Sequence, residues 1–540
     1  MVMTTIFRRY GLLTTLLILL SATMLRAAEP QLVVNIIVGS MRHNDIERYN
    51  DNLTDGGFRR LAEGGAYYTN AYYDFALTST AAGLATFATG TQPSVHGAIG
   101  EEWWNYVDSS RATLIGDNKS HPVPFSTGAG SVSPHRLSAP TACDMAKTAD
   151  TNSKCYTVAL DPLSAILLTG RNGVGFWPEN NKTHWTTSSA YLHTTPEWVA
   201  EYNRNGNNAM YMLKRWTPIC PAASYLNSEV AVIEDIKNKS TKLLTDIHHR
   251  LGNSAIDDMR YSPAGNTILL EFASTLIAQE RLGADSAPDI LNICLDTSRY
   301  IASAYGPESM EYEDMLYRLD RDLAEFLTYL YAQVDDPQKI VVVLTADHGT
   351  SPSYNPIGGK HRERFNVRQM EVIVNAFLGA RYGSENYVLG FANNALYLNH
   401  QTILEKRLSL ESIREEVATF LLQMRGVATA ISASSLRNTS FADGRTRLLQ
   451  QSFYATRSGD VVVDFMPGWI IEDSATRSAS DAGYNYDRKV PLIIYGTAAK
   501  GRYDKAVSIV EVAPTITALL GIEQPWASTA NPLKECITTK

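Results

Sequence analysis

An aspartate–histidine pair stands where an α/β protein usually keeps its reactive groups. Asp347 and His348 follow residues 339–345 (KIVVVLT), an apolar run that predicts a buried strand. Open α/β sheets place their chemistry at the carboxyl ends of such strands. A carboxylate and an imidazole at this point could hold a metal ion. The alternative is a residual polar pair at a strand end.

The elements that would position this pair form a regular series. Apolar runs at residues 31–38, 290–295 and 490–495 predict further buried strands, the last of them the final core strand. Helical periodicity at residues 267–278, 311–331 and 508–521 predicts helices between them. Residues 78–90 (TSTAAGLATFATG) predict a loop that turns into a closely packed helix, which Thr80 could cap. Alternating strands and helices predict a doubly wound α/β/α sandwich with a mostly parallel sheet.

Two segments interrupt this series. Residues from about 97 to 235 are irregular and rich in Trp, Asn, Ser and Pro, which predicts a cap inserted above the strand ends. Residues from about 366 to 440 follow a helix–strand–strand–helix–strand pattern, which predicts a small α+β insertion. The tryptophans of the cap could line a pocket, but packing against the core is the favoured interpretation.

The first residues and the composition indicate an exported protein. Residues 1–28 carry two arginines, a ten-residue apolar stretch and small residues, as a secretory signal peptide does; a retained anchor is the alternative. Residues 29–540 would then form the mature protein, periplasmic or secreted, with no later membrane-spanning segment. The formal net charge is -8 and no basic block occurs, so a nucleic-acid partner is not expected. Among five cysteines, Cys143 and Cys155 are the first candidates for a disulfide.

Several motifs together resemble the alkaline phosphatase superfamily, in particular the secreted phosphate-irrepressible alkaline phosphatases and the nucleotide pyrophosphatase/phosphodiesterases. The segment around Thr80 resembles the nucleophile motif, and residues 345–349 (TADHG) resemble a metal-ligand motif. Matching segments also occur at residues 185–203, 262–266, 306–307 with 318–320, 457–460, 490–492 and 513–515. The resemblance extends over about residues 31–535.

The resemblance implies a two-zinc centre with a threonine or serine nucleophile, held by three acids and three histidines. Thr80 occupies the nucleophile position, and Asp347 and His348 occupy two of the ligand positions. The other four ligand positions carry residues that cannot replace the family's ligands, namely Gly39, Arg299, Ser303 and Ser480. Zinc takes about four ligands, at least three of them from the protein at a catalytic site. The sequence therefore predicts no metal, or at most one zinc ion.

The positions that would bind phosphate are changed as well. Glu101 replaces an asparagine, and the Asp161-Pro162-Leu163 segment replaces a Lys-x-Arg clamp, so Asp161 and Leu163 stand at the two clamp positions. Two like unit charges about 4 Å apart repel by about 4 kcal/mol at an effective dielectric constant of about 20. A dianionic phosphate would therefore be repelled.

These changes predict a degenerate pseudoenzyme that binds an unknown small molecule or protein. The alternative is an active metal-dependent phosphoric ester hydrolase with Thr80 as nucleophile, in which His43, His96 or His361 supplies a missing ligand. Without zinc, Asp347 would be a buried charge in need of a partner. We therefore expect Arg299 to form a forked hydrogen bond with Asp347.

Overall fold

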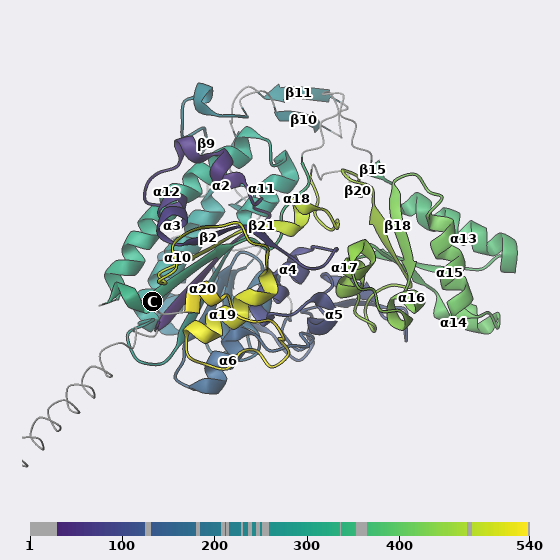
Figure 1. Cartoon of the computed structure of the whole chain (residues 1–540), viewed down its shortest axis with the longest axis horizontal. Helices are drawn as coiled ribbons and strands as arrows, with labels where there is room; N and C mark the ends of the chain where they lie inside the picture. Colours follow the sequence, from purple (N-terminus) through teal and green to yellow (C-terminus); the bar gives the residue numbers. More distant parts are fainter. Residues whose placement is uncertain are drawn as a thin grey trace, which may run out of the picture.

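The computed structural model describes residues 30–124, 131–179, 184–206, 211, 215–227, 231–235, 240–244, 249–250, 259–334, 336–352, 364–471 and 478–537. These residues form a large α/β part and a smaller α+β part beside it (Figure 1). The predicted signal peptide and His361 lie outside the described residues.

The large part is built on an eleven-stranded sheet. At its centre β1 (Leu32–Val38) lies between β13 (Asp289–Leu295) and β14 (Ile340–Thr345), and all three are parallel. The sheet continues from β13 through the parallel strands β6 (Cys155–Ala159) and β7 (Val174–Pro178) to β8 (Trp185–Ser188) and β5 (Pro122–Val123). Beyond β14 it continues through antiparallel β21 (Lys489–Tyr495) to β2 (Ala66–Tyr72) and β22 (Gly501–Tyr503). The central strands are apolar and fully buried because helices cover both faces.

Helices pack on both faces of this sheet, as predicted for a doubly wound sandwich. One layer contains α4 (Thr80–Thr89), α6 (Ala142–Ala149), α7 (Pro162–Thr169), α19 (Val512–Leu519) and α20 (Lys534–Ile537). The other contains α3 (Phe58–Gly64), α10 (Ala264–Glu280), α11 (Thr297–Tyr305) and α12 (Met310–Gln333). Figure 1 shows α3, α10 and α12 across the sheet from α6, α19 and α20.

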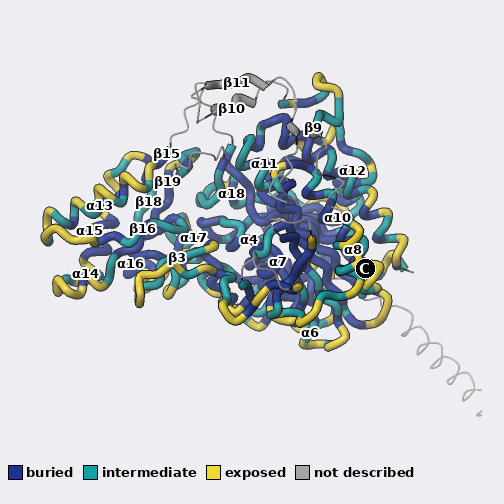
Figure 2. The backbone as a smooth tube through the Cα atoms, turned by 180° about the vertical axis from the view of Figure 1, so that it is seen from behind, coloured by how far each residue is buried: buried dark blue, intermediate teal, exposed yellow. Residues whose placement is uncertain are grey.

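The smaller part has its own sheet and its own core. Its four strands are ordered β16 (Val388–Ala392), β17 (Ala395–Leu398), β19 (Val461–Phe465) and β18 (Val427–Ser432). Helices α13 (Val367–Tyr382), α14 (His400–Glu405) and α15 (Leu410–Leu421) accompany this sheet, with exposed outer surfaces (Figure 2). The chain enters by β15 (Arg364–Phe365) and leaves by β20 (Ile470–Ile471), which pair with each other. The predicted end near residue 440 is therefore wrong, because β19 is an inner strand of this sheet.

Two further predictions need correction. The range 97–235 is not one continuous cap, because β6, α7 and β7 lie inside it and belong to the main sheet. The pieces outside the sheet include the hairpin of β3 (Glu102–Trp104) and β4 (Arg111–Thr113) and the helix α8 (Glu197–Asn205). The strand β21 is not the last of the sheet either, since β22 and β23 (Val507–Ser508) follow and pair with β2.

Cysteine and tryptophan side chains serve packing. All five cysteines are free thiols, so the expected Cys143–Cys155 disulfide is not formed; the Cys155 thiol instead lies 3.6 Å from the Cys143 carbonyl oxygen. The ring of Trp185 stacks on Phe272 at 3.9 Å between centroids and is fully buried. The packing interpretation is therefore confirmed for Trp185, which lies in β8 of the main sheet and not in a cap. Within the described residues, no helix has the length and apolar character needed to cross a bilayer.

Candidate functional site

The candidate site lies where four parallel strands of the main sheet end. Asp161, Asp296 and Asp347 follow the carboxyl ends of β6, β13 and β14, and Gly39 and Ser40 follow β1. Because these strands are neighbours in the sheet, residues far apart in sequence meet at one edge. This is the edge at which open α/β sheets bind ligands.

Asp347 is buried and only half satisfied. Its Oδ1 accepts hydrogen bonds from the backbone N–H groups of Ser40 (2.7 Å) and His348 (2.9 Å). Its Oδ2 has no hydrogen-bond partner within the described ranges, although the residue is only 1% exposed. Gly83 of α4 lies against the backbone of Asp347: a Cβ atom there would be 1.8 Å from the Asp347 carbonyl oxygen. The predicted close packing of this helix is therefore what positions Asp347.

Thr80 and His348 form a hydrogen-bonded pair. The His348 Nδ1 is 2.5 Å from the carbonyl oxygen of Gly349, so we assign its proton to Nδ1. The other nitrogen, Nε2, then accepts from the Thr80 hydroxyl at 3.1 Å. Ser79, not Thr80, caps α4, because its Oγ accepts from the backbone N–H of Ala82 at 3.2 Å. The capping role considered for Thr80 is therefore wrong. We call Thr80, Asp347 and His348 the Thr80 group.

Arg299 fills the space above Gly39. A Cβ atom on Gly39 would lie 3.2 Å from the Arg299 Cβ and 3.3 Å from its Cγ, so the arginine stem packs where an aspartate side chain would start. The guanidinium Nη2 donates to Asp161 at 2.7 Å, and the Asp296 Oδ1 lies 3.4 Å from both Nε and Nη2. The ring of Tyr300 lies 4.4 Å from the guanidinium carbon. We call Asp161, Asp296 and Arg299 the Arg299 group.

The expected hydrogen bond between Arg299 and Asp347 is therefore wrong. The guanidinium bonds two other acids, one of them fully buried, and it acts on Asp347 only through longer-range electrostatics. Burial alone would raise the pKa of Asp161, but Arg299 holds it below its usual value. Burial raises the pKa of Asp296 in spite of Arg299. Asp161 also caps α7 by accepting from the backbone N–H of Leu163, so this clamp segment now serves helix structure.

The remaining predicted positions lie around these two groups. Ser303 is on α11 and Ser480 is in the segment that follows residue 478; the two segments touch through the Ser478 Oγ, which donates to the carbonyl oxygen of Ala302 at 2.8 Å. Burial raises the pKa of the Glu101 carboxylate, and the negative charge of Asp161 raises it further. Neither serine brings the nitrogen ligand that a histidine would supply.

The histidines considered as replacement ligands lie elsewhere. His96 is fully buried, its Nε2 is 3.0 Å from the Thr86 Oγ1, and its Nδ1 accepts from the backbone N–H of Ala98. The pKa of His43 is lowered by burial and by Lys489, so its electrostatic neighbours are outside the Thr80 group. Neither histidine completes a metal site.

The donor set does not fit the zinc centre that the resemblance implies. The unpartnered Asp347 Oδ2 is 3.4 Å from the His348 Nε2, and Thr80 adds only a neutral hydroxyl. Within the described ranges, no three His, Cys, Asp or Glu side chains are grouped as a metal site would require. One carboxylate and one imidazole fall short of the three protein ligands of catalytic zinc, and no second set replaces them.

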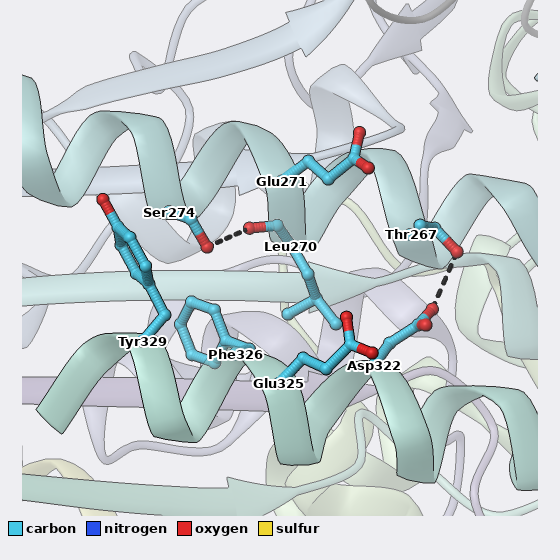
Figure 3. Close-up of a pocket in the computed structure, with 8 residues that line it drawn as sticks. All are labelled: Thr267, Leu270, Glu271, Ser274, Asp322, Glu325, Phe326 and Tyr329. Atoms are coloured by element: carbon cyan, nitrogen blue, oxygen red, sulfur yellow. Dashed lines mark hydrogen bonds between the residues drawn. The ribbon is translucent and has the colours of Figure 1, made fainter. Parts of the chain in front are cut away.

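A separate cavity of about 330 Å³ lies between α10 and α12 (Figure 3). Carboxylates of Glu271, Asp322 and Glu325 border it together with the rings of Phe326 and Tyr329. Asp322 accepts a hydrogen bond from the Thr267 hydroxyl at 2.7 Å, and burial raises its pKa to about 6. This cavity holds no hydroxyl–imidazole pair and is distinct from the strand-end site.

Comparison with known proteins identifies the fold and the family. The family model described as type I phosphodiesterase / nucleotide pyrophosphatase matches residues 33–485. The chain belongs to the type I phosphodiesterase / nucleotide pyrophosphatase family.

The chain has relatives among the alkaline phosphatases. Alkaline phosphatase PafA of Elizabethkingia meningoseptica is 28% identical to this chain over 518 residues, which is 94% of either chain. Alkaline phosphatase PhoV of Synechococcus elongatus is 27% identical over 511 residues, 93% of this chain and 92% of the relative. The crystal structure of wild-type PafA matches with a TM-score of 0.88 at 27% identity, covering 95% of this chain and all of that one. Murine ectonucleotide pyrophosphatase / phosphodiesterase 5 shares the fold, with a TM-score of 0.51 at 10% identity over 93% and 97% of the chains. The fold is therefore that of a phosphoric ester hydrolase.

Three residues of this phosphodiesterase-family site were not predicted from the sequence. Asp296 and Tyr300 complete the surroundings of Arg299, and Asp481 lies close enough to interact electrostatically with His348. Asp296 could have been found, because it directly follows the predicted strand at residues 290–295, as Asp347 follows its own strand. The sequence carries no comparable signal for Asp481.

Proposed function

We propose that this chain is an exported pseudoenzyme of the phosphodiesterase family, a degenerate phosphatase that binds a small molecule or protein at its remodelled site. The observation that carries the proposal is the placement of Arg299. Its stem packs over Gly39, and its guanidinium is bonded to Asp161 and Asp296. A fixed cation thus stands beside positions whose zinc ligands are replaced. A fold alone does not establish an activity.

The partner and the compartment belong to the same proposal. The signal-peptide pattern of residues 1–28 supports a periplasmic or secreted location. The acidic composition supports a partner other than nucleic acid.

A direct experiment measures metal content and turnover together. The purified protein is analysed for zinc and assayed with p-nitrophenyl phosphate and bis-p-nitrophenyl phosphate, alongside Thr80→Ala. We expect neither stoichiometric zinc nor turnover above that of Thr80→Ala. Two zinc ions per chain, or turnover that Thr80→Ala abolishes, would refute the proposal.

One observation favours the second candidate, an active metal-dependent hydrolase that uses Thr80. The Thr80 hydroxyl, the His348 Nε2 and the free Asp347 oxygen converge at one point, with separations of 3.1 Å from hydroxyl to nitrogen and 3.4 Å from nitrogen to carboxylate. The names of the relatives, alkaline phosphatases, also favour this candidate. It predicts one bound zinc per chain and phosphatase activity that a chelator removes, both measured in the same assay.

A further inference from the structure

Two carboxylates near the Thr80 group, and one carboxylate oxygen within it, have no hydrogen-bond partner among the described residues. The side chains of Glu101 and Asp481 form no hydrogen bond or ion pair with any residue in the described part of the chain; they interact with their neighbours only electrostatically. The Asp347 Oδ2 is buried and forms no hydrogen bond with any residue that the structure describes. The His348 Nε2 lies 3.4 Å from this oxygen, but in the assigned tautomer it has no proton to donate. Leaving a buried charged oxygen without a donor is costly.

Arg299, the arginine that interacts electrostatically with Glu101 and Asp347, already has bonding partners. Arg299 is hydrogen-bonded to Asp161, and Asp296 lies against the same guanidinium, so its charge is shared between two acids. Glu101 interacts unfavourably with Asp161 and Asp481, and both interactions raise its pKa further above its usual value. A phosphate dianion would therefore meet an excess of negative charge where the family binds phosphate.

We propose that the remodelled site binds an organic cation, the ammonium group of a small amine, which donates to the free Asp347 oxygen and is balanced by Glu101 and Asp481. This inference rests on the proposed function, because a two-zinc centre would occupy the same space. An ammonium group carries three donors and needs only acceptors and compensating charge. Calcium and magnesium require six or more oxygen ligands or tightly held waters, and zinc requires more strong donors than the Thr80 group supplies.

The test uses calorimetry on the full mature protein at neutral pH. The probes are n-butylamine and 1,4-diaminobutane, with 1-butanol as the uncharged analogue and inorganic phosphate and zinc chloride as competing ions. We expect both amines to bind with a stoichiometry of one and 1-butanol and phosphate not to bind. Asp347→Asn and Asp481→Asn should each weaken amine binding by about tenfold, which corresponds to about 1.4 kcal/mol.

The matched control is Glu63→Gln, which removes one exposed carboxylate of α3 and should leave affinity unchanged. Glu325→Gln reports on the acidic cavity between α10 and α12. If Glu325→Gln abolishes binding while Asp481→Asn does not, the amine binds in that cavity and the inference is wrong. Asp481 is half-buried and at positive φ, which asparagine tolerates, so this variant remains informative if Asp347→Asn does not fold.

The two proposals fail in different ways. A protein without zinc and turnover that binds phosphate but no amine would overturn this inference and leave the pseudoenzyme proposal standing. Stoichiometric zinc that displaces the amine, together with turnover, would overturn the pseudoenzyme proposal itself.

Discussion

The buried carboxylates in the two halves of the strand-end site have different kinds of partner. In the Arg299 group, two carboxylates share one guanidinium at 2.7 Å and 3.4 Å. In the Thr80 group, Asp347 is held by two backbone N–H groups and keeps one oxygen free. In the first half a guanidinium offsets part of the carboxylate charge, while the second has an acceptor without a donor among the described residues. The comparison shows that Arg299 supplies a cation to only one of the two halves.

The largest expected effect concerns the scaffold of the Thr80 group. Gly83→Ala places a Cβ 1.8 Å from the backbone oxygen of Asp347, so α4 and the β14 loop must separate. We expect a loss of at least about 3 kcal/mol in the free energy of unfolding, measured by urea denaturation. Gly379→Ala in the interior of α13 is the control, because the added Cβ would come no closer than 3.9 Å to Ser384. It should be neutral or stabilising by about 0.5–1 kcal/mol. Equal effects would show that Gly83 does not position Asp347.

The next effect tests the Arg299 group. Arg299→Met keeps most of the stem but leaves Asp161 and Asp296 without their cation. Breaking a buried pair costs about 3–5 kcal/mol, and the 15–20% exposure of Arg299 and Asp161 places the expected loss near the lower end, about 3 kcal/mol at pH 7. Arg204→Met, which breaks an exposed pair with Glu197, should cost less than about 0.5 kcal/mol.

The pH dependence of this variant follows from the pKa of Asp161. Arg299 lowers that pKa in the folded state, so the pair stabilises the protein above the unfolded pKa of about 3.9, and the contribution disappears as pH falls through the lower, folded value. The difference between wild type and Arg299→Met should therefore shrink in acid. A difference that stays constant down to pH 3 would assign the loss to packing of the arginine stem instead.

Much of this fold is predictable from apolar runs, but the pairing inside the site is not. The strands β1, β13 and β14 stand out because both faces are buried and nearly every residue is apolar. The strand β6 (CYTVA) was missed because it is short and lies between irregular segments. Motif spacing marks, one by one, the positions at which the resemblance implies metal ligands. It does not reveal that Arg299 pairs with Asp161 and Asp296, because this pairing depends on the directions of side chains at the ends of different strands.

A buried acid beside the Thr80 group gives the opposite pH response. Asp487, whose carbonyl accepts from the backbone N–H of Gly349 at 2.6 Å, is fully buried, and burial raises its pKa well above the usual value. Ionisation of this carboxylate therefore destabilises the folded state. The destabilisation grows as pH rises from the pKa of the unfolded state towards that of the folded state. Asp487→Asn removes the charge and should stabilise the protein by about 1 kcal/mol at pH 7 and by nothing at pH 3, measured by urea denaturation. Destabilisation at both pH values would mean that the hydrogen bond from the backbone N–H of Ala482 to the Asp487 carboxylate contributes more to stability than the buried charge costs.

The smallest effects separate the roles of two adjacent hydroxyl groups in the Thr80 group. Ser79 accepts from the backbone N–H of Ala82, so Ser79→Ala should cost about 1 kcal/mol in thermal unfolding because α4 loses its cap. Thr80→Val keeps the shape of this half-buried side chain and removes only its hydrogen bond to His348. Its expected cost is about 0.5 kcal/mol. If Thr80→Val were the more damaging change, Thr80 would have a structural role, and its match to the nucleophile motif would carry no functional meaning. If the order is as expected, the hydroxyl of Thr80 contributes little to folding, and any loss of ligand binding in Thr80→Val is due to the site itself.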